Sequence, residues 1–333
     1  PAYERGETRK MQSGIVVCHA TPDAWVPSKF PGWDSIAPCP PRGARYTIGR
    51  TMYETDSLPA DWVTRCNAMD EVWVPTAFAR DAFAAAGVAA SKLVVLGEPI
   101  DTAFFDPALY KPLPLKINSR PRQSITPLSH PFRFLSVFKW EARKGWDVLL
   151  EAYWSAFTKS DGVRLLLKTY LPSWEAGPPD LNLHVEAFAR QLGKRRGDLA
   201  AVELHVDEST SRGALAEMYR GADAFVLPTR GEGWGLPIAE AMASGLPVIA
   251  TNFSGPTAFL TDDNSYPLRV ARRLPGGQAE PSVADVAQAM KRVRDKPAEA
   301  RRKGERARAD MAAKFSSHVV AAAARARLEQ IRH

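Results

Sequence analysis

The sequence predicts an α/β protein of two domains, each built on a parallel sheet that helices cover on both faces. Short apolar stretches, of the length of buried strands, alternate with longer amphipathic stretches along most of the chain. The chain has 333 residues. Since a domain averages about 150 residues, this length indicates two domains.

Composition and charge exclude several classes of protein. The chain is 45% hydrophobic and 24% charged, which is typical of soluble globular proteins and excludes disordered or fibrous chains. Its net charge is +7, yet residues 291–333 alone carry 13 Lys or Arg against 5 Asp or Glu. The basic charge therefore belongs to one end of the chain, and no nucleic-acid partner is expected.

The three cysteines are Cys18, Cys39 and Cys66, and no two of them form a Cys-x-x-Cys pair. Their odd number and wide spacing predict neither a disulfide nor a zinc site, which favours a reducing compartment. No apolar run reaches the roughly 18 residues of a membrane-spanning helix, and the polar start does not resemble a signal peptide. These observations predict a cytoplasmic protein, and the basic tail leaves contact with a membrane surface open.

The elements of the first part are expected in the order strand, strand, helix, strand. Residues 15–18, 72–74 and 93–96 are the apolar strands. The helix begins after Thr76, a good N-cap residue, and ends at Gly87.

A proline-rich stretch divides the chain. Five prolines fall within residues 111–131, where proline disfavours both a helix and a central strand. We therefore predict an N-terminal domain at 1–110, a linker at 111–131, a C-terminal domain at 132–310 and a basic C-terminal helix at 311–333. The first domain is short for such a pair.

The second part continues the alternation. The expected strands are 132–138, 163–168, 202–206, 224–227 and 246–250, and the expected helices are 146–157, 214–220 and 238–244.

The most informative segment is a glycine-rich loop between a strand and a helix. Gly231, Gly233 and Gly235 follow the strand, and Pro237 lies in the first helical turn. Glycines permit close backbone approach, and free amides at a helix start favour an anionic or hydroxyl-rich ligand. A dinucleotide fingerprint fails because Leu236 stands where its third glycine is required, and no phosphate loop of the Gly-x4-Gly-Lys-Ser/Thr type occurs.

Two glutamates accompany this loop. Glu232 lies among the glycines, where it could face ligand hydroxyls, and Glu240 lies about one turn into the apolar helix. An ionised Glu is rarely buried without a partner, so residue chemistry alone leaves Glu240 either solvated or bound to a ligand.

The complete run Gly-Glu-Gly-Trp-Gly-Leu-Pro-Ile-Ala-Glu-Ala-Met-Ala-Ser-Gly-Leu-Pro-Val-Ile-Ala-Thr, residues 231–251, resembles the donor-site signature of retaining glycosyltransferases of family 4, glycosyl transferases group 1. The resemblance implies a GT-B fold, with two Rossmann-like domains facing each other across a cleft. It also implies that Glu232 contacts the donor sugar and Glu240 the nucleotide ribose. The remaining nucleotide-sugar contacts implied are Gly233, Trp234, Gly235 and Leu236. Apart from the resemblance, Lys168 at the end of the expected strand 163–168 is a further candidate cation near the crevice.

A basic turn supplies candidate cations for the donor diphosphate. Lys139 and Lys144 flank the turn after the strand at 132–138. Fixed cations there would stabilise the charge that develops on the leaving diphosphate. The family resembled usually has Arg at the position of Lys139, so Arg143 is a further candidate for phosphate contact.

The first domain offers weaker candidates. His19 follows the first strand, where parallel-sheet proteins place ligand residues, and it is a candidate catalytic group. Glu54 and Asp56 could contact an acceptor or cap the helix that follows Ser57.

The resemblance implies a metal-independent retaining glycosyltransferase without a cofactor. Its donor is a nucleotide-sugar, and its acceptor is a hydroxyl of a glycan, a lipid-linked sugar or a protein. A nucleotide-sugar binding module without catalysis is the alternative, because the first domain is short and Lys139 departs from the pattern. A nicotinamide-dependent oxidoreductase is a second alternative, which the failed fingerprint disfavours.

Overall fold

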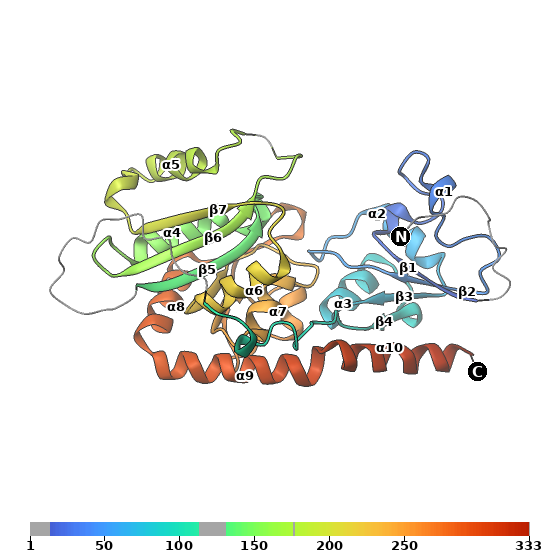
Figure 1. Ribbon diagram of the computed structural model, residues 1–333. Helices are drawn as coiled ribbons and strands as arrows, with labels where there is room; N and C mark the ends of the chain where they lie inside the picture. The colour runs from blue at the N-terminus through green and yellow to red at the C-terminus, as the bar shows by residue number, and fades with distance from the viewer. Residues whose placement is uncertain (1–13, 113–130, 176, 333) are drawn as a thin grey trace.

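The computed structural model describes residues 14–112, 131–175 and 177–332, which form two α/β domains side by side (Figure 1). Each domain has an all-parallel sheet. Most of the predicted linker, residues 113–130, lies outside the described residues.

The first domain contains a four-stranded sheet in the order β1-β2-β3-β4. Its strands and helices are β1 (Ile15–His19), α1 (Trp33–Ile36), β2 (Tyr46–Arg50), α2 (Ala60–Asn67), β3 (Glu71–Val74), α3 (Ala77–Ala86) and β4 (Leu93–Val95). As predicted, Thr76 caps α3 by accepting a hydrogen bond from the Ala79 N–H at 2.9 Å. The helix ends at Gly87, whose φ is 111°.

The second domain contains a six-stranded sheet in the order β10-β9-β8-β5-β6-β7. Its strands are β5 (Phe132–Lys139), β6 (Val163–Tyr170), β7 (Ala201–Val206), β8 (Ala224–Leu227), β9 (Val248–Thr251) and β10 (Tyr266–Leu268). From β5 the chain first adds strands on one side and then, from β8, on the other. The carboxyl ends of β5 and β8 therefore form a topological switch point, the usual ligand position in such sheets.

Helices and a small hairpin complete this domain. They are α4 (Trp146–Ala156), α5 (Leu181–Gln191), α6 (Arg212–Gly221), α7 (Leu236–Ala243), α8 (Val283–Asp295), α9 (Pro297–Phe315) and the antiparallel pair β11 (Val270–Arg273) and β12 (Ala279–Pro281). A large core of buried apolar side chains joins the sheet to these helices.

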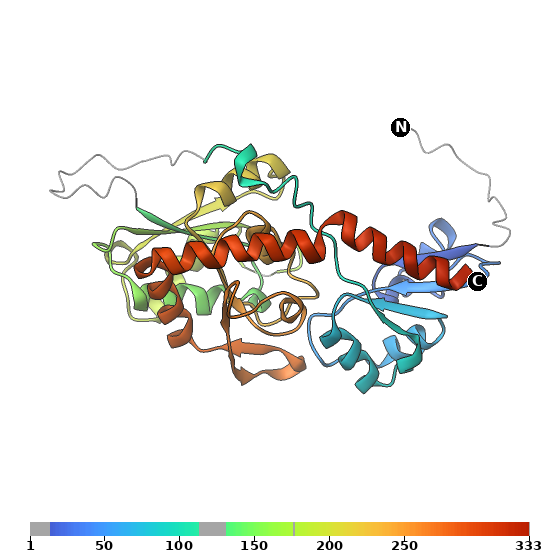
Figure 2. The same cartoon turned by 90° about the horizontal axis from the view of Figure 1, so that it is seen from below.

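The last two helices cross from the second domain to the first. α9 packs on α7, and α10 (Ser317–Arg332) continues along the first domain (Figure 2). Ile100 donates its N–H to the Phe315 carbonyl at 2.7 Å where the two helices meet. Arg327 of α10 pairs with the buried Glu71 of β3. The predicted boundary at residue 311 lies within α9.

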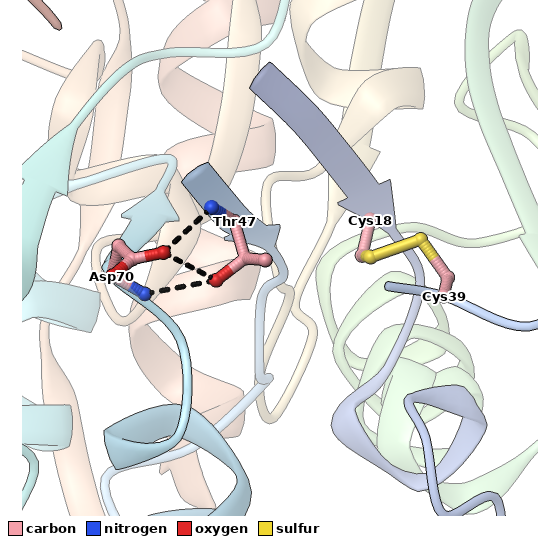
Figure 3. Close-up of a disulfide and its surroundings, with 4 residues drawn as sticks. All are labelled: Cys18, Cys39, Thr47 and Asp70. Carbon is pink, nitrogen blue, oxygen red and sulfur yellow. Dashed lines mark hydrogen bonds between the residues drawn. A yellow bond between two sulfur atoms is a disulfide. The ribbon is translucent and has the colours of Figure 1, made fainter. Parts of the chain in front are cut away.

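The prediction that the cysteines form no disulfide is wrong. Cys18 near the end of β1 is bonded to Cys39 (Figure 3). Cys66 is free and buried. The segment between β1 and β2 turns back over the end of β1, and the Val26 N–H donates to the Cys39 carbonyl at 2.8 Å. Spacing along the chain did not reveal this path, and the cysteines no longer argue for a reducing compartment.

Figure 3 also shows how β2 is tied to the start of β3. One carboxylate oxygen of Asp70 accepts from the Thr47 N–H at 2.7 Å and from its hydroxyl at 2.8 Å.

Within the described ranges, no helix is both long and apolar enough to cross a membrane.

Candidate active site

Two loops meet at the switch point, one after β5 and one after β8. The Arg230 N–H donates to the Arg143 carbonyl at 2.7 Å. Gly145 has a φ of 66°, and a Cβ there would lie 2.1 Å from the Pro228 carbonyl oxygen. Position 145 therefore requires a glycine, because the backbone there has a positive φ and the Pro228 carbonyl leaves no room for a side chain.

A buried ion pair lies at the centre of these loops. The ammonium of Lys144 donates to both carboxylate oxygens of Glu232, at 2.7 and 2.8 Å. The Thr229 hydroxyl donates to the same carboxylate at 3.0 Å. Glu232 is 5% exposed and Lys144 is 8% exposed. The structure thus brings together two of the residues predicted from sequence.

Arg143 joins this pair. One guanidinium nitrogen, Nη1, donates to the Gly231 carbonyl at 2.7 Å and lies 3.6 Å from Glu232. The other, Nη2, lies 2.5 Å from Glu141 and 3.8 Å from Glu54 of the first domain. Burial lowers the pKa of Arg143, but the three carboxylates outweigh burial, and the net shift is upward. Arg143 and Lys144 therefore form a fixed cationic pair.

Lys139 and His19 lie apart from this cluster. Lys139 is exposed, and its ammonium lies 5.2 Å from the ring centroid of Trp174. His19 is exposed at the end of β1, opposite Arg50 of β2. Within the residues that the structure describes, no hydrogen bond or ion pair joins either side chain to Lys144 or Glu232.

Glu240 occupies a separate position on α7. The Tyr219 hydroxyl of α6 donates to its carboxylate at 2.9 Å and reaches the Pro237 carbonyl at 3.3 Å. Burial raises the pKa of Glu240 to about 7, against smaller lowering effects from Tyr219 and Arg212. Glu240 is thus neither fully solvated nor ion-paired. Tyr219 was missed in the sequence because an isolated helical tyrosine usually belongs to the core.

The backbone and side chains of the glycine-rich loop have different surroundings. Gly233 and Gly235 are buried, and the side chain of Leu236 is exposed. The Trp234 ring is 2% exposed and packs against Phe259 and Phe315, each at a centroid distance of 5.1 Å. The Trp234 ring therefore anchors the glycine-rich loop in the core.

Lys168 is the remaining predicted contact. It lies on β6, which pairs with β5, and its ammonium donates to the Asp207 carbonyl. Burial lowers its pKa, and the charge of Asp207 acts in the opposite direction.

A loop of the first domain, residues 51–57, lies directly on the second domain. A Cβ on Gly231 would lie 2.4 Å from the Glu54 carbonyl oxygen, and one on Gly233 would lie 2.7 Å from the Met52 sulfur. Asp56 pairs with Arg273 of β11. Glu54 and Asp56 thus make contacts between the domains, which the sequence could not show.

A separate hollow of about 1010 Å³ lies away from this cluster, between β10 and the helices α8 and α9. Lys291, Arg292 and Lys303 are among its lining residues, and it includes none of the predicted site residues. No cluster of three or more His, Cys, Asp or Glu suited to a metal ion occurs in the described ranges.

The two parallel sheets and the loops between them define the class of protein. The chain has the GT-B fold of two Rossmann-like domains, and residues 132–296 match the family Glycosyl transferases group 1. The chain therefore contains a domain of that family.

Similar proteins agree with this assignment. A D-inositol 3-phosphate glycosyltransferase of Xylanimonas cellulosilytica is 34% identical over 120 residues, which cover 36% of this chain and only 26% of that relative. A glycosyltransferase of Rickettsia africae superposes with a TM-score of 0.68 at 17% identity, covering 95% of this chain and 76% of that one. HepE of Anabaena, solved with UDP and glucose, superposes with a TM-score of 0.65 at 15% identity. The match covers 86% of this chain and 72% of HepE. At these identities the solved structures show the fold alone.

Proposed function

We propose that the protein is a retaining glycosyltransferase that moves a sugar from a nucleotide-diphosphate-sugar to an acceptor hydroxyl. The observation that carries this proposal is the cluster of Arg143, Lys144 and Glu232 at the switch point of the second sheet. It combines fixed cations with a carboxylate, which are the groups that a diphosphate and a sugar require.

Each group has a chemical role in this proposal. Arg143 and Lys144 bind the diphosphate and stabilise the charge that grows on it as the glycosidic bond breaks. Glu232 accepts hydrogen bonds from hydroxyls of the donor sugar, and Glu240 accepts them from the ribose. Arg143 takes the place of the second cation that the sequence assigned to Lys139, because Arg143 is in the cluster.

The reaction needs no carboxylate as a base. The acceptor oxygen bonds to the anomeric carbon on the face from which the diphosphate departs, so the configuration is retained. The bond from that carbon to the diphosphate oxygen breaks, and its electrons stay on the diphosphate. An oxygen of the departing diphosphate takes the proton of the acceptor. Since Arg143 and Lys144 supply the positive charge, we propose that neither a metal ion nor a cofactor takes part.

The similar proteins support the donor class. HepE was solved with UDP-glucose, and a matching relative of Rhizobium meliloti is a mannosyltransferase of lipopolysaccharide core biosynthesis. They support a nucleotide-sugar donor here.

One observation favours the alternative of a binding module without catalysis. Lys144 donates to both carboxylate oxygens of Glu232, so these groups serve catalysis only if a bound donor displaces part of that pairing. A thermal-shift screen of UDP-, GDP- and ADP-sugars tests binding, since a ligand of the folded state raises its melting temperature. Slow hydrolysis of the bound donor supports the transferase, and binding without hydrolysis or transfer supports the module. Binding of none of these donors contradicts both.

A further inference from the structure

Ser254 has an unusual backbone conformation beside the proposed site. Its φ is 59° and its ψ is −130°. Across the described ranges it is the single residue other than glycine with a positive φ. These angles suit the first central position of a type II′ turn, where glycine is strongly preferred. A serine here is strained, and strain of this kind gathers at functional positions.

The strained turn holds the backbone of Glu232. The Ser254 hydroxyl donates to the Glu232 carbonyl oxygen at 2.8 Å, and the Gly255 N–H donates to the same oxygen at 2.8 Å. Ser254 is 1% exposed, so both bonds are shielded from water. Since Lys144 and Thr229 hold the carboxylate, Glu232 is fixed at both of its ends.

The turn lies as close to the glycine-rich loop as the backbone permits. A Cβ on Gly255 would lie 2.6 Å from the Trp234 Cα and 2.7 Å from the Glu232 carbonyl oxygen. The turn itself is secured further along, where the Thr257 hydroxyl donates to the Ser254 carbonyl at 2.6 Å.

Fixing the Glu232 carbonyl also fixes the next amide. In a trans peptide the N–H points away from the C=O, so the Gly233 N–H points away from Ser254. Gly233 is buried, and the described part of the chain provides no acceptor for this N–H. Buried backbone N–H groups are nearly always paired, with protein or with water, so this N–H is available to a ligand acceptor.

From these contacts we infer that Ser254 is a positioning residue for donor-sugar recognition. It sets the orientation of the Glu232–Gly233 peptide, so that the Glu232 carboxylate and the Gly233 N–H face the sugar together. This inference rests on the proposed function, because it assumes that a nucleotide-sugar binds at the cluster.

Titration calorimetry with UDP and UDP-glucose tests the inference. If the thermal-shift screen selects another base, GDP with GDP-mannose or ADP with ADP-glucose replaces this pair. Ser254→Ala removes the hydroxyl and disfavours the turn. We expect it to raise the Kd for UDP-glucose about ten-fold, as for a lost positioned hydrogen bond, and to change the Kd for UDP less than about two-fold.

Ser254→Gly provides the rescue. Glycine adopts the turn without strain and keeps the Gly255 N–H in place, so this variant should recover most of the lost affinity for UDP-glucose. Ser254→Gly loses only the hydrogen bond from the Ser254 hydroxyl, so it keeps the test decisive if Ser254→Ala does not fold. In that case a Kd for UDP-glucose about three-fold above wild type, with the Kd for UDP unchanged, supports the inference.

Ser265→Ala is the matched control. Ser265 is fully buried and donates to the Thr261 carbonyl at 2.7 Å, away from the site. Its loss should lower the melting temperature and leave the ratio of the two Kd values unchanged. Equal loss of UDP and UDP-glucose affinity in the Ser254 variants, or no loss, would overturn the inference alone. A wild-type protein that binds no nucleotide-sugar would overturn the proposed function together with it.

Discussion

The ion pair between Lys144 and Glu232 is unusual because it is nearly inaccessible to water. Removing one member of a buried pair leaves an uncompensated charge, which costs about 3–5 kcal/mol. The pair is therefore both a structural feature of the free protein and, in our proposal, the group that the donor rearranges.

Lys144→Met tests this double role. We expect a lower melting temperature, because Glu232 stays buried without its cation, and transfer or donor hydrolysis slower by about 100-fold or more. Lys139→Met is the matched control, since Lys139 is an exposed lysine that precedes the same turn. Rate losses of equal size in the two variants would show that the roles assigned to these lysines are wrong.

The raised pKa of Glu240 predicts that both stability and nucleotide affinity depend on pH. Its pKa of about 7 lies above the ordinary value of 4.5 because of burial. The folded state thus binds a proton between these values that the unfolded state has lost, so the free protein loses stability as the pH rises from 4.5 through 7. In our proposal the ionised form of Glu240 accepts the ribose hydrogen bonds, so nucleotide affinity should rise about ten-fold between pH 6 and 8.

Glu240→Gln is the comparison for both effects. In this variant, stability and nucleotide affinity should both depend less on pH than in the wild type. Melting temperatures and calorimetric titrations from pH 5 to 8 measure the two effects. A wild-type nucleotide affinity that stays constant over this range would contradict the assignment of Glu240.

At the scale of elements, the site depends on the two loops at the switch point. Gly145→Ala tests their contact, because an alanine there meets both an unfavourable φ and the Pro228 carbonyl. We expect a loss of about 2 kcal/mol in the free energy of unfolding, measured by urea denaturation. Gly162→Ala is the control, since Gly162 has a φ of 64° with open space around it. A loss no larger at Gly145 than at Gly162 would show that the close approach of the loops is unimportant.

Many of the helices, strands and loops could be predicted from the sequence, because buried strands and helix caps have local signals. Thr76 and Gly87 marked α3, and the glycine-rich run marked the loop before α7. Contacts between distant segments have no local signal. The pairing of Cys18 with Cys39, the turn of Lys139 toward Trp174 and the partnership of Tyr219 with Glu240 depend on how the chain folds back, so the structure was needed to find them.

At the scale of the whole molecule, α10 holds the two domains together. Glu71 is buried and receives hydrogen bonds from Tyr46, Trp73 and Arg327. Burial raises the pKa of Glu71, but the bonds from these three residues outweigh it and the net shift is downward. The stabilisation by this group is therefore present above the ordinary pKa of 4.5 and is lost as the pH falls through the lower folded value.

Arg327→Ala should lower the melting temperature at pH 7, because it leaves the buried Glu71 without its cation. The difference from wild type should shrink in acid, where Glu71 is protonated in both proteins. A difference that is independent of pH would show that α10 is held by its apolar contacts and that the ion pair contributes little.

The basic charge of the last helices has a structural explanation at this scale. Arg294, Arg308 and Arg327 pair with carboxylates outside these helices, namely Asp161, Asp106 and Glu71. Part of the net charge that the sequence places at this end therefore joins helices to the rest of the fold.

The central claim is that a nucleotide-sugar binds at the cluster of Arg143, Lys144 and Glu232. A crystal structure with bound UDP tests it most directly. The account predicts the diphosphate within hydrogen-bond distance of Arg143 and Lys144, and the ribose hydroxyls on Glu240. A nucleotide bound elsewhere, as in the hollow lined by Lys291, Arg292 and Lys303, would contradict the account.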